Sequence, residues 1–373
     1  MNGTEVVQWD LAFPESATKS WLLHSRFFPS KMGGYPAWLA LNDLPDTSCP
    51  RCTQKMTFLC QVYSPWEDAG SDSGFHRAVF VFFCRAASCH KETGADQGGG
   101  AFKVFRSQLG RKNDFYPFHP PKEEVMGADD LKFVVPDLCR LCGSPGDKMC
   151  GGCKRVKYCS KEHQERDWKR PSGHKTECKN LDLDLSVKPQ RNGFNLPELE
   201  LVIEPAEDED LPEEANEESD GDDEDVDKEE MEKYEALQKE GKTGTLSAQE
   251  IAKHLAEDED KKADPVFVHF KRSIQHSPEQ VIRYGKGGQP LWISSKDIPK
   301  KIPCCEICGA KRQFEFQIMP QMLNSCDLDA STLSEESVDW GVIAVFTCSN
   351  SCDPSGSTAY KSEFVHVQSV PNE

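Results

Sequence analysis

The sequence lacks the features that define several large classes of protein. It contains no uninterrupted apolar run of the roughly eighteen residues that a membrane-spanning helix needs. Its first residues lack the basic region and apolar core of a secretory signal. The glycine-rich stretch 94–101 has no Lys-Ser or Lys-Thr pair, which a phosphate-binding loop requires. We therefore expect an intracellular chain with no membrane partner and no nucleotide hydrolysis.

Positive charge does not balance the negative charge of this chain, and the excess of acid is local. The chain has 373 residues, of which 44 are Lys or Arg and 63 are Asp or Glu, for a formal net charge of −19. Residues 204–230 hold seventeen of the acidic residues and one lysine, so this tract alone carries −16. Because it repels itself and has no aromatic residue, we predict a disordered acidic linker over residues 204–233. The rest of the chain is long enough for two or three domains.

Cysteine, by contrast, is abundant. The chain has 17 cysteines, many of them in closely spaced pairs. An intracellular compartment keeps thiols reduced, so such pairs indicate metal ligands and not disulfides. Thiolate and imidazole groups are the donors of structural zinc sites. The sequence therefore predicts a protein that binds several Zn²⁺ ions.

Six features recur in the same order in two parts of the chain. GGYPAW and GGQPLW are each followed by a Cys-x-x-Cys pair, an alternating apolar stretch, an apolar run ending in cysteine, a further cysteine and a short apolar segment. The matching positions are 33–38 and 287–292, 49–52 and 305–308, 57–63 and 314–320, 78–84 and 342–348, Cys89 and Cys352, and 102–105 and 364–367. Agreement in order, spacing and residue type indicates an internal repeat.

The repeat predicts the architecture. Short runs of apolar, β-branched and aromatic residues are typical of buried strands. We predict a mainly β fold in which residues 1–120 and 264–373 form two related, zinc-clamped modules, with a zinc finger inserted at 139–178. Each small module exposes an apolar face and an edge strand, so we expect the two copies to cover each other. The finger is set apart from these modules in sequence.

Three shorter segments carry local predictions. LPELELVI (196–203) has the leucine spacing of a nuclear export signal, but a strand is favoured because such runs are common. Asp264-Pro265 predicts the start of a helix. Ser277 and Gln280, on either side of Pro278, predict the start of another.

The central finger supplies eight candidate zinc ligands. They are Cys139, Cys142, Cys150, Cys153, Cys159, His163, His174 and Cys178. Eight donors fit two tetrahedral zinc ions. Cys159 and His163 are four residues apart, which places both on one face of a helix. The four pairs can be grouped in chain order or interleaved, and spacing alone does not decide between these groupings.

The two repeats each supply four further thiols. The sets are Cys49, Cys52, Cys84 and Cys89 in the first copy and Cys305, Cys308, Cys348 and Cys352 in the second. Buried free cysteines are the alternative, since thiols are among the most buried side chains. Recurrence at matched positions favours two closed zinc sites. Cys304 can replace Cys305, although the repeat favours Cys305, and the unmatched Cys60 and Cys326 are interpreted as ordinary core or surface thiols.

The sequence gives little indication that the protein is an enzyme. A nucleophilic cysteine needs a lowered thiol pKa and a base within hydrogen-bond reach. Nearly every cysteine is assigned to metal, and His76 and His90 are better explained as packed or surface residues. We expect a binding protein with no catalytic residue, not an enzyme.

The finger resembles the MYND family, whose pattern is CxxC, CxxC, YCSxxCQxxxW and HxxxC. Residues 158–168 read YCSKEHQERDW, with His163 where most relatives have cysteine. The resemblance implies interleaved sites, with Cys139, Cys142, Cys159 and His163 around one zinc and Cys150, Cys153, His174 and Cys178 around the other. It also implies recognition of proline-containing peptides. The NHxC and GEE signatures of the methyltransferase domain found in some MYND proteins are absent.

Four further segments resemble, in the same order, the programmed cell death protein 2 family. They are FPSKMGGYPAWL (28–39), FRSQLGRKNDFYPF (105–118), RYGKGGQPLWIS (283–294) and CGAKRQFEFQIMPQMLN (308–324). The resemblance implies a cytoplasmic and nuclear protein linked to cell proliferation and apoptosis. It further implies an escort for a newly made basic protein of the small ribosomal subunit, in support of 40S ribosome biogenesis.

The charge pattern is compatible with such an escort. An acidic tract attracts a basic client, which ribosomal RNA can later displace; a solvating linker between modules is an equally supported alternative. The finger is locally basic, but a solvated charged face is favoured over DNA binding. The alternative function is a nuclear transcription regulator that contacts corepressors or DNA through the finger.

Overall fold

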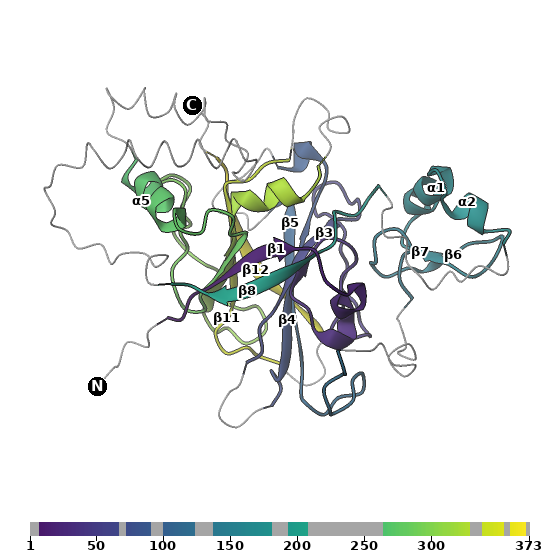
Figure 1. Ribbon diagram of the computed structural model, residues 1–373, viewed down its shortest axis with the longest axis horizontal. Coiled ribbons are helices and arrows are strands. Elements are labelled where there is room, and N and C mark those ends of the chain that lie inside the picture. Colours follow the sequence, from purple (N-terminus) through teal and green to yellow (C-terminus); the bar gives the residue numbers. More distant parts are fainter. Residues whose placement is uncertain are drawn as a thin grey trace, which may run out of the picture.

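The computed structural model in Figure 1 describes residues 7–66, 72–90, 100–123, 137–180, 193–207, 264–328, 338–353 and 359–370. From residue 208 onward, the expected acidic linker lies outside these ranges. Within them, ten strands close into an antiparallel barrel in the order β1-β8-β2-β3-β4-β5-β12-β11-β10-β9. The strands are β1 (Asp10–Glu15), β2 (Lys31–Met32), β3 (Thr57–Tyr63), β4 (His76–Phe83), β5 (Phe102–Leu109), β8 (Leu199–Pro205), β9 (Ile282–Tyr284), β10 (Arg312–Ile318), β11 (Val342–Cys348) and β12 (Tyr360–Gln368). The predicted mainly β fold is confirmed.

The barrel consists of two halves that meet at two seams. Strands β2 to β5 come from the first repeat and β9 to β12 from the second, and β5 pairs with β12 at one seam. At the other seam β1 pairs with β8, but β1 continues the sheet into β9 of the second repeat, and β8 continues it into β2 of the first. Each half is thus completed by a strand from elsewhere in the chain. The two copies cover each other's edges, as expected.

The segment 196–203 provides the strand that completes the first half. Its residues belong to β8 from Leu199 onward, so the strand interpretation is confirmed. Gly33 and Gly34 both have positive φ, and a Cβ on Gly33 would lie 1.8 Å from the carbonyl oxygen of Pro197. Only glycine lets the two backbones approach this closely. In the second half a Cβ on Gly285 or Gly288 would lie 2.4 or 2.7 Å from the Trp9 ring.

The repeat extends to individual hydrogen bonds. In the first half the Gln61 side chain accepts from the backbone N–H of Ala37 (2.9 Å) and donates to its carbonyl oxygen (3.4 Å). In the second half Gln317 accepts from Leu291 N–H (2.6 Å) and donates to its carbonyl oxygen (3.0 Å). The pairing of β3 with β4 and the pairing of β10 with β11 also shift in register at the same place, just after the first phenylalanine of β3 and of β10. The two sequence segments therefore fold into matching structures.

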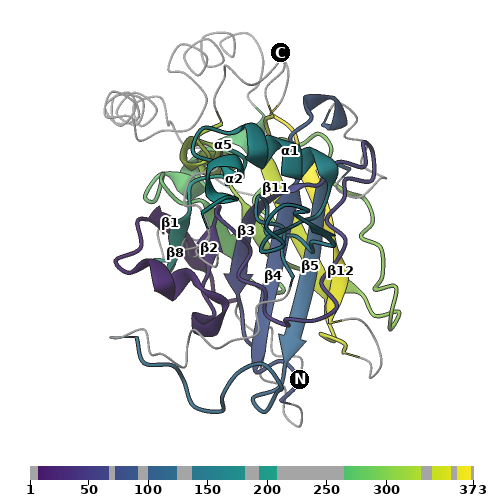
Figure 2. The same cartoon turned by 90° about the vertical axis from the view of Figure 1, so that its right-hand side faces the viewer.

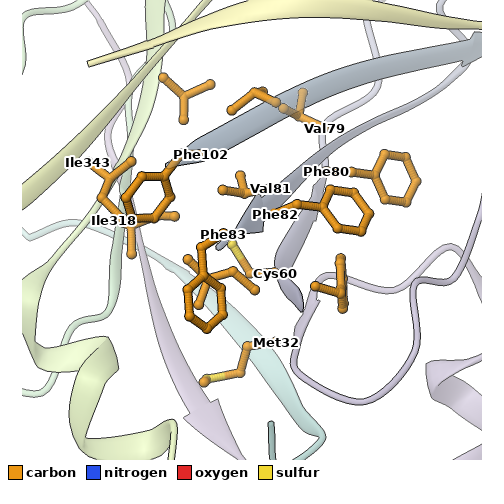
Figure 3. Close-up of a cluster of buried hydrophobic side chains, with 14 of the residues drawn as sticks. Met32, Cys60, Val79, Phe80, Val81, Phe82, Phe83, Phe102, Ile318 and Ile343 are labelled. Carbon is orange, nitrogen blue, oxygen red and sulfur yellow. The ribbon is translucent and has the colours of Figure 1, made fainter. Parts of the chain in front are cut away.

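The interior of the barrel is apolar at one end. Alternate residues of β4 point to opposite sides, so Val79, Val81 and Phe83 face inward while Phe80 and Phe82 point to the outer layer (Figure 3). Residues from both halves meet there: Met32, Cys60, Phe83, Phe102, Ile318 and Ile343. Trp340 caps this end with edge-on contacts to Phe83 and Phe102.

The other end of the barrel interior contains buried ion pairs. Arg77 of β4 forms a two-pronged ion pair with Glu315 of β10, and its Nη2 lies 2.6 Å from Oε2. Both side chains are fully buried. Burial raises the pKa of Glu315, but the charge and hydrogen bonds of Arg77 outweigh burial and lower it to about 2. A second buried pair joins Arg106 of β5 to Glu363 of β12, with Nε and Oε1 2.7 Å apart. Both pairs hold the two halves together.

Among the described residues, four 3-10 helices and a longer α-helix surround the barrel. The short ones are η1 (Ser20–Leu23), η2 (Ser25–Phe27), η3 (Ala87–Cys89) and η5 (Pro320–Ser325). Helix α5 (Pro265–Ile274) begins as predicted, because the Asp264 side chain accepts from the backbone N–H of Val266 at 3.0 Å. The predicted helix after Ser277 is wrong: residues 277–280 make a single turn, in which the Gln280 side chain donates back to Ser277 O. No helix among the described residues has the length and apolarity to cross a membrane.

The finger packs against the first half of the barrel. It contains the hairpin β6 (Lys148–Met149) and β7 (Lys157–Tyr158), helix α1 (Lys161–Lys169) and helix α2 (His174–Glu177). Figure 2 views the barrel from the finger side, with α1 and α2 in front of it. The indole of Trp38 donates to Gly143 O (2.8 Å), and the hydroxyl of Tyr35 donates to Arg140 O (2.7 Å). The finger, although set apart from the modules in sequence, is therefore docked on the first half of the barrel.

Removing one partner of the Arg77–Glu315 pair is expected to be costly. Arg77→Met leaves the Glu315 carboxylate buried without its cation, so the free energy of unfolding should fall by about 3–5 kcal/mol. The double variant Arg77→Met/Glu315→Met should lose less than either single variant. Chemical denaturation measures all three. Lys148→Met, at an exposed pair with Asp147, is the control and should change stability by less than about 1 kcal/mol. Additive losses in the double variant would contradict this account.

Candidate metal centres

The structure brings the predicted ligands together in four separate groups. In each group the donor atoms all lie within 4.8 Å of one another. Site 1 is Cys139, Cys142, Cys159 and His163; site 2 is Cys150, Cys153, His174 and Cys178; site 3 is Cys49, Cys52, Cys84 and Cys89; site 4 is Cys305, Cys308, Cys348 and Cys352. The two finger sites are interleaved. Cys304 is exposed and lies outside site 4.

One backbone turn recurs at the four Cys-x-x-Cys pairs. In each, the residue four positions after the first cysteine donates its N–H to that cysteine's carbonyl oxygen at 2.9 Å. The same residue has positive φ: Thr53 (62°), Gly143 (73°), Lys154 (55°) and Gly309 (74°). The turn brings both sulfurs to the same side of the loop. Thiolates held at this spacing fit a tetrahedral zinc ion, and each set of four would close its coordination shell.

Site 1 lies where the first finger turn meets helix α1. Ser160 caps the helix by accepting from the backbone N–H of His163 at 3.2 Å. This cap fixes His163 with its Nδ1 3.2 Å from Cys159 Sγ and 3.7 Å from Cys139 Sγ. Hydrogen bonds from Cys142 and Cys159 hold the pKa of Cys139 well below its usual range. All four side chains are buried. The histidine that departs from the usual finger pattern is therefore in position to coordinate.

Site 2 joins the β6–β7 hairpin to helix α2. Cys153 Sγ lies 3.4 Å from His174 Nε2, and Cys150 Sγ lies 3.9 Å from Cys178 Sγ. His174 is fully buried, while Cys153 and Cys178 are partly exposed. The Nδ1 of His174 faces Glu177 Oε2 at 3.8 Å. A carboxylate behind a ligating histidine is a common arrangement that orients the ring toward the metal.

Sites 3 and 4 occupy equivalent places in the two repeats. In site 3 the closest sulfur pairs are Cys52–Cys84 (3.5 Å) and Cys49–Cys89 (3.9 Å). In site 4 they are Cys308–Cys348 (3.5 Å) and Cys305–Cys352 (3.7 Å). In both repeats the third ligand, Cys84 or Cys348, lies at the end of a buried strand. Zinc at these sites would tie the first turn of each half to its central strands.

The ionic end of the barrel lies directly behind site 4. Arg106 donates to Cys352 O (3.1 Å), Arg77 donates to Ser351 Oγ (3.2 Å), and Cys348 N–H donates to Glu363 Oε2 (3.1 Å). Four thiolates around Zn²⁺ carry a net charge of −2, which nearby guanidinium groups stabilise. Sequence reasoning missed these arginines. The sequence signal was clear only for Arg77, which precedes the apolar run of HRAVFVFF, because Arg106 lies in FKVFRSQL among other polar residues.

The remaining cysteines and histidines are packed. Cys60 and Cys326 are buried in the core, and burial raises the pKa of Cys326 to about 12. His76 stacks on Phe28 at 4.0 Å, and burial lowers the pKa of His76 to about 4. His90 Nε2 lies 2.6 Å from Cys84 O, a geometry in which its N–H donates. The core interpretation of both thiols and the packed interpretation of His76 are confirmed.

Four complete ligand sets predict four zinc ions per chain. Elemental analysis of the purified protein should give this value, and a value near two would exclude sites 3 and 4. Cys142→Ser should remove at least one ion and unfold the finger locally, because zinc ligation supplies much of the folding energy of such modules. Cys304→Ser is the matched control and should leave four ions bound, since Cys304 is exposed and belongs to no set.

The four sites should release zinc in an order set by the exposure of their ligands. Site 4 includes the exposed Cys308, and site 2 includes two partly exposed thiols, whereas all four ligands of site 1 are buried. A chelator must reach the ion, so we expect sites 4 and 2 to empty first and site 1 last. Chelator titration followed by mass spectrometry under native conditions, with one-site ligand variants to assign each step, measures the order. Early loss from site 1 would contradict it.

Models of known protein families match most of the chain. Residues 8–123 match the family model "Programmed cell death protein 2, N-terminal domain", residues 264–369 match "Programmed cell death protein 2, C-terminal putative domain", and residues 139–178 match "MYND finger". No solved structure matches the chain. The MYND match and the four Cys/His groups together indicate zinc binding.

Two relatives match over nearly their whole length. Programmed cell death protein 2 of Bos taurus is 42% identical over 371 residues, covering 97% of this chain and 96% of the relative. The protein of the same name from Rattus norvegicus is 43% identical over 372 residues, with the same coverage. A more distant match, to the "Probable 20S rRNA accumulation protein 4" of Schizosaccharomyces pombe, is 32% identical over 120 residues and covers 28% of each chain. This chain belongs to the programmed cell death protein 2 family.

Proposed function

We propose that the protein is a zinc-dependent, non-catalytic binding protein that escorts a basic protein of the small ribosomal subunit and thereby supports ribosome assembly. It would act in both cytoplasm and nucleus. The observation that carries the proposal is the negative charge that begins at the β1–β8 seam of the barrel. The name of the fission yeast relative, which refers to accumulation of 20S rRNA, supports the same process.

The seam itself is acidic where the tract begins. Glu15 of β1 and Glu200 of β8 are direct cross-strand partners, and neither forms an ion pair with any other residue that the structure describes. Like charges placed opposite each other are destabilising, and the neighbouring cation Lys31, which lies opposite Glu200 on β2, is paired with Glu198. Glu204, the first acidic residue of the tract, is exposed on the same strand. A basic client would relieve this repulsion.

The tract extends this charge over a long stretch of sequence. Residues 204–230 carry a net charge of −16. Such a charge speeds capture of a cationic partner, and the attraction is screened beyond about 10 Å at 0.1 M ionic strength. Specific recognition then needs a surface of fixed shape, and the closed barrel is the larger rigid body that could carry one. We assign capture to the tract and recognition to the barrel.

The finger's surface fits a protein ligand better than DNA. Several of its cations are paired with carboxylates on the finger itself: Lys157 with Asp137, Lys161 and Lys169 with Glu165, and Arg170 with Asp167. Paired cations contribute little to phosphate binding.

The finger also exposes apolar side chains. Met149 and Trp168 are 49% and 36% exposed, and Trp168 packs against the site 2 ligand His174. These side chains suit a proline-containing peptide, the ligand class that the MYND resemblance implies.

Removing the charge of the tract should slow capture but spare recognition. We expect deletion of residues 208–230, which leaves β8 intact, to lower the association rate of the basic client and to flatten its dependence on salt, while a specific complex remains. A full-length variant with every Asp and Glu of 208–230 changed to Asn and Gln is the matched control for linker length. If charge is the cause, both variants should behave alike in stopped-flow binding.

The client is identified by affinity capture of the full chain followed by mass spectrometry. A basic small-subunit ribosomal protein, retained by both tract variants, is the expected result. Recovery of corepressors or DNA in its place would overturn the proposal in favour of a transcription regulator. Loss of the ribosomal protein from finger variants alone, with tract and barrel variants unaffected, would assign recognition to the finger.

A further inference from the structure

One contact between finger and barrel is made by a turn of site 1. Hydrogen bonds that join this turn to the barrel include Tyr35 Oη to Arg140 O (2.7 Å), Trp38 Nε1 to Gly143 O (2.8 Å), and one between the hydroxyls of Thr47 and Ser144 (2.7 Å). All three fall on residues 140–144, the turn that carries the ligand Cys142. The β6–β7 hairpin, which carries much of site 2, makes none of them.

The fit of this turn depends on a missing side chain. Gly143 has φ +73°, and a Cβ there would lie 2.9 Å from both Pro36 Cδ and the Tyr35 ring. Pro36 and Tyr35 belong to the GGYPAW segment, which ends in Trp38. The first repeat therefore presents a proline, an aromatic ring and an indole N–H to a glycine turn. Any larger residue at position 143 would push the finger away.

The covered surface is apolar. Trp38 is 1% exposed and packs on Phe80 and Phe82 of β4, with ring centroids 5.3 and 5.6 Å away. The second repeat provides an internal comparison, because no finger covers its equivalent tryptophan, Trp292. Trp292 is partly exposed, and its indole donates to no described residue. The docked finger therefore contributes to the burial of Trp38, together with barrel rings that include Tyr360, whose centroid lies 5.2 Å away.

A second contact holds the finger from its far side. The ring of Phe194 lies between Arg85 of the barrel (5.6 Å) and Arg166 of helix α1 (5.2 Å). It also meets the edge of His163, the fourth ligand of site 1, at 4.5 Å. Cation–π contacts of this kind are stabilising when partly buried. Both contacts with the barrel therefore converge on ligands of site 1.

The geometry of site 1 determines the shape of the docking turn. Within it, Cys139 N–H donates to Ser144 O (2.7 Å) and Gly143 N–H donates to Cys139 O (2.9 Å). The Arg140 side chain also reaches Glu177 (2.6 Å) on helix α2, and this contact is the link between the turn and site 2 whose importance the site 2 variant below tests. The Cys139 and Cys142 sulfurs converge on the same point as Cys159 and His163. A zinc ion at that point would fix the turn in the shape that fits Tyr35 and Trp38.

We propose that site 1 acts as a latch, that is, a zinc site whose occupancy determines whether the finger is docked on the barrel. With zinc bound, the finger is held on the barrel and covers the Trp38 surface; when zinc leaves site 1, the finger detaches and exposes that surface. Site 2 shapes the outer part of the finger and does not control docking. This inference does not depend on the proposed ribosomal client.

Hydroxyl-radical footprinting of the full chain tests the latch. In Cys142→Ser we expect the oxidation rate of Trp38 to rise about tenfold or more, because three hydrogen bonds and the aromatic cover are lost together. In Cys153→Ser, the matched site 2 variant, Trp38 should stay protected. Trp340, fully buried inside the barrel, reports global unfolding and should stay protected in both variants. Equal exposure of Trp38 in both finger variants, or in neither, would overturn the proposal.

A second variant separates docking from folding of the finger. Trp38→Phe removes one docking hydrogen bond and leaves every zinc ligand in place. We expect this variant to keep four zinc ions while hydrogen exchange in residues 139–146 becomes faster. Hydrogen exchange unchanged from the wild type would show that the Trp38 contact does not hold the finger and would also overturn the proposal.

Discussion

The pairing of β1 with β8 is the constraint on which the rest of the structure depends. Neither repeat can complete its own sheet: β2 needs β8, and β9 needs β1. Unpaired strand edges leave backbone N–H and C=O groups without partners, so the chain must return after the finger to close the barrel. The finger is consequently an insertion anchored at both ends, between β5 and β8. Its position beside the first half follows from this connection.

The two halves share a plan but differ in their interiors. Zinc ligands, backbone turns, a register shift and a buried glutamine recur in both, which preserves the scaffold. Inside the barrel, however, Phe83 precedes the site 3 ligand Cys84, whereas Thr347 precedes the site 4 ligand Cys348. One end is filled by aromatic rings and the other by buried ion pairs. Such pairs stabilise only when every charge is compensated, and the thiolates of site 4 lie close to that network.

This arrangement separates the tasks of the protein in space. The barrel supplies a rigid body with two structural metal sites, and the acidic tract leaves it at a seam that is itself acidic. The finger uses its site 1 side for docking, while Met149 and Trp168 remain exposed on its site 2 side. Under the proposed function, the finger and the barrel would therefore bind partners on different surfaces, although the docking contact links them physically.

The sequence alone determined the features that depend on local spacing. Ligand pairs, the internal repeat, the buried strands and the β8 segment could all be predicted, because each rests on a period or a fixed separation along the chain. Only the tertiary structure decided which half receives β1, where Arg77 and Arg106 find their carboxylates, and that Gly143 meets Trp38. These contacts join residues far apart in sequence, and their energy depends on burial and distance, which no local pattern specifies. For the same reason the finger, separate in sequence, proved to be docked in space.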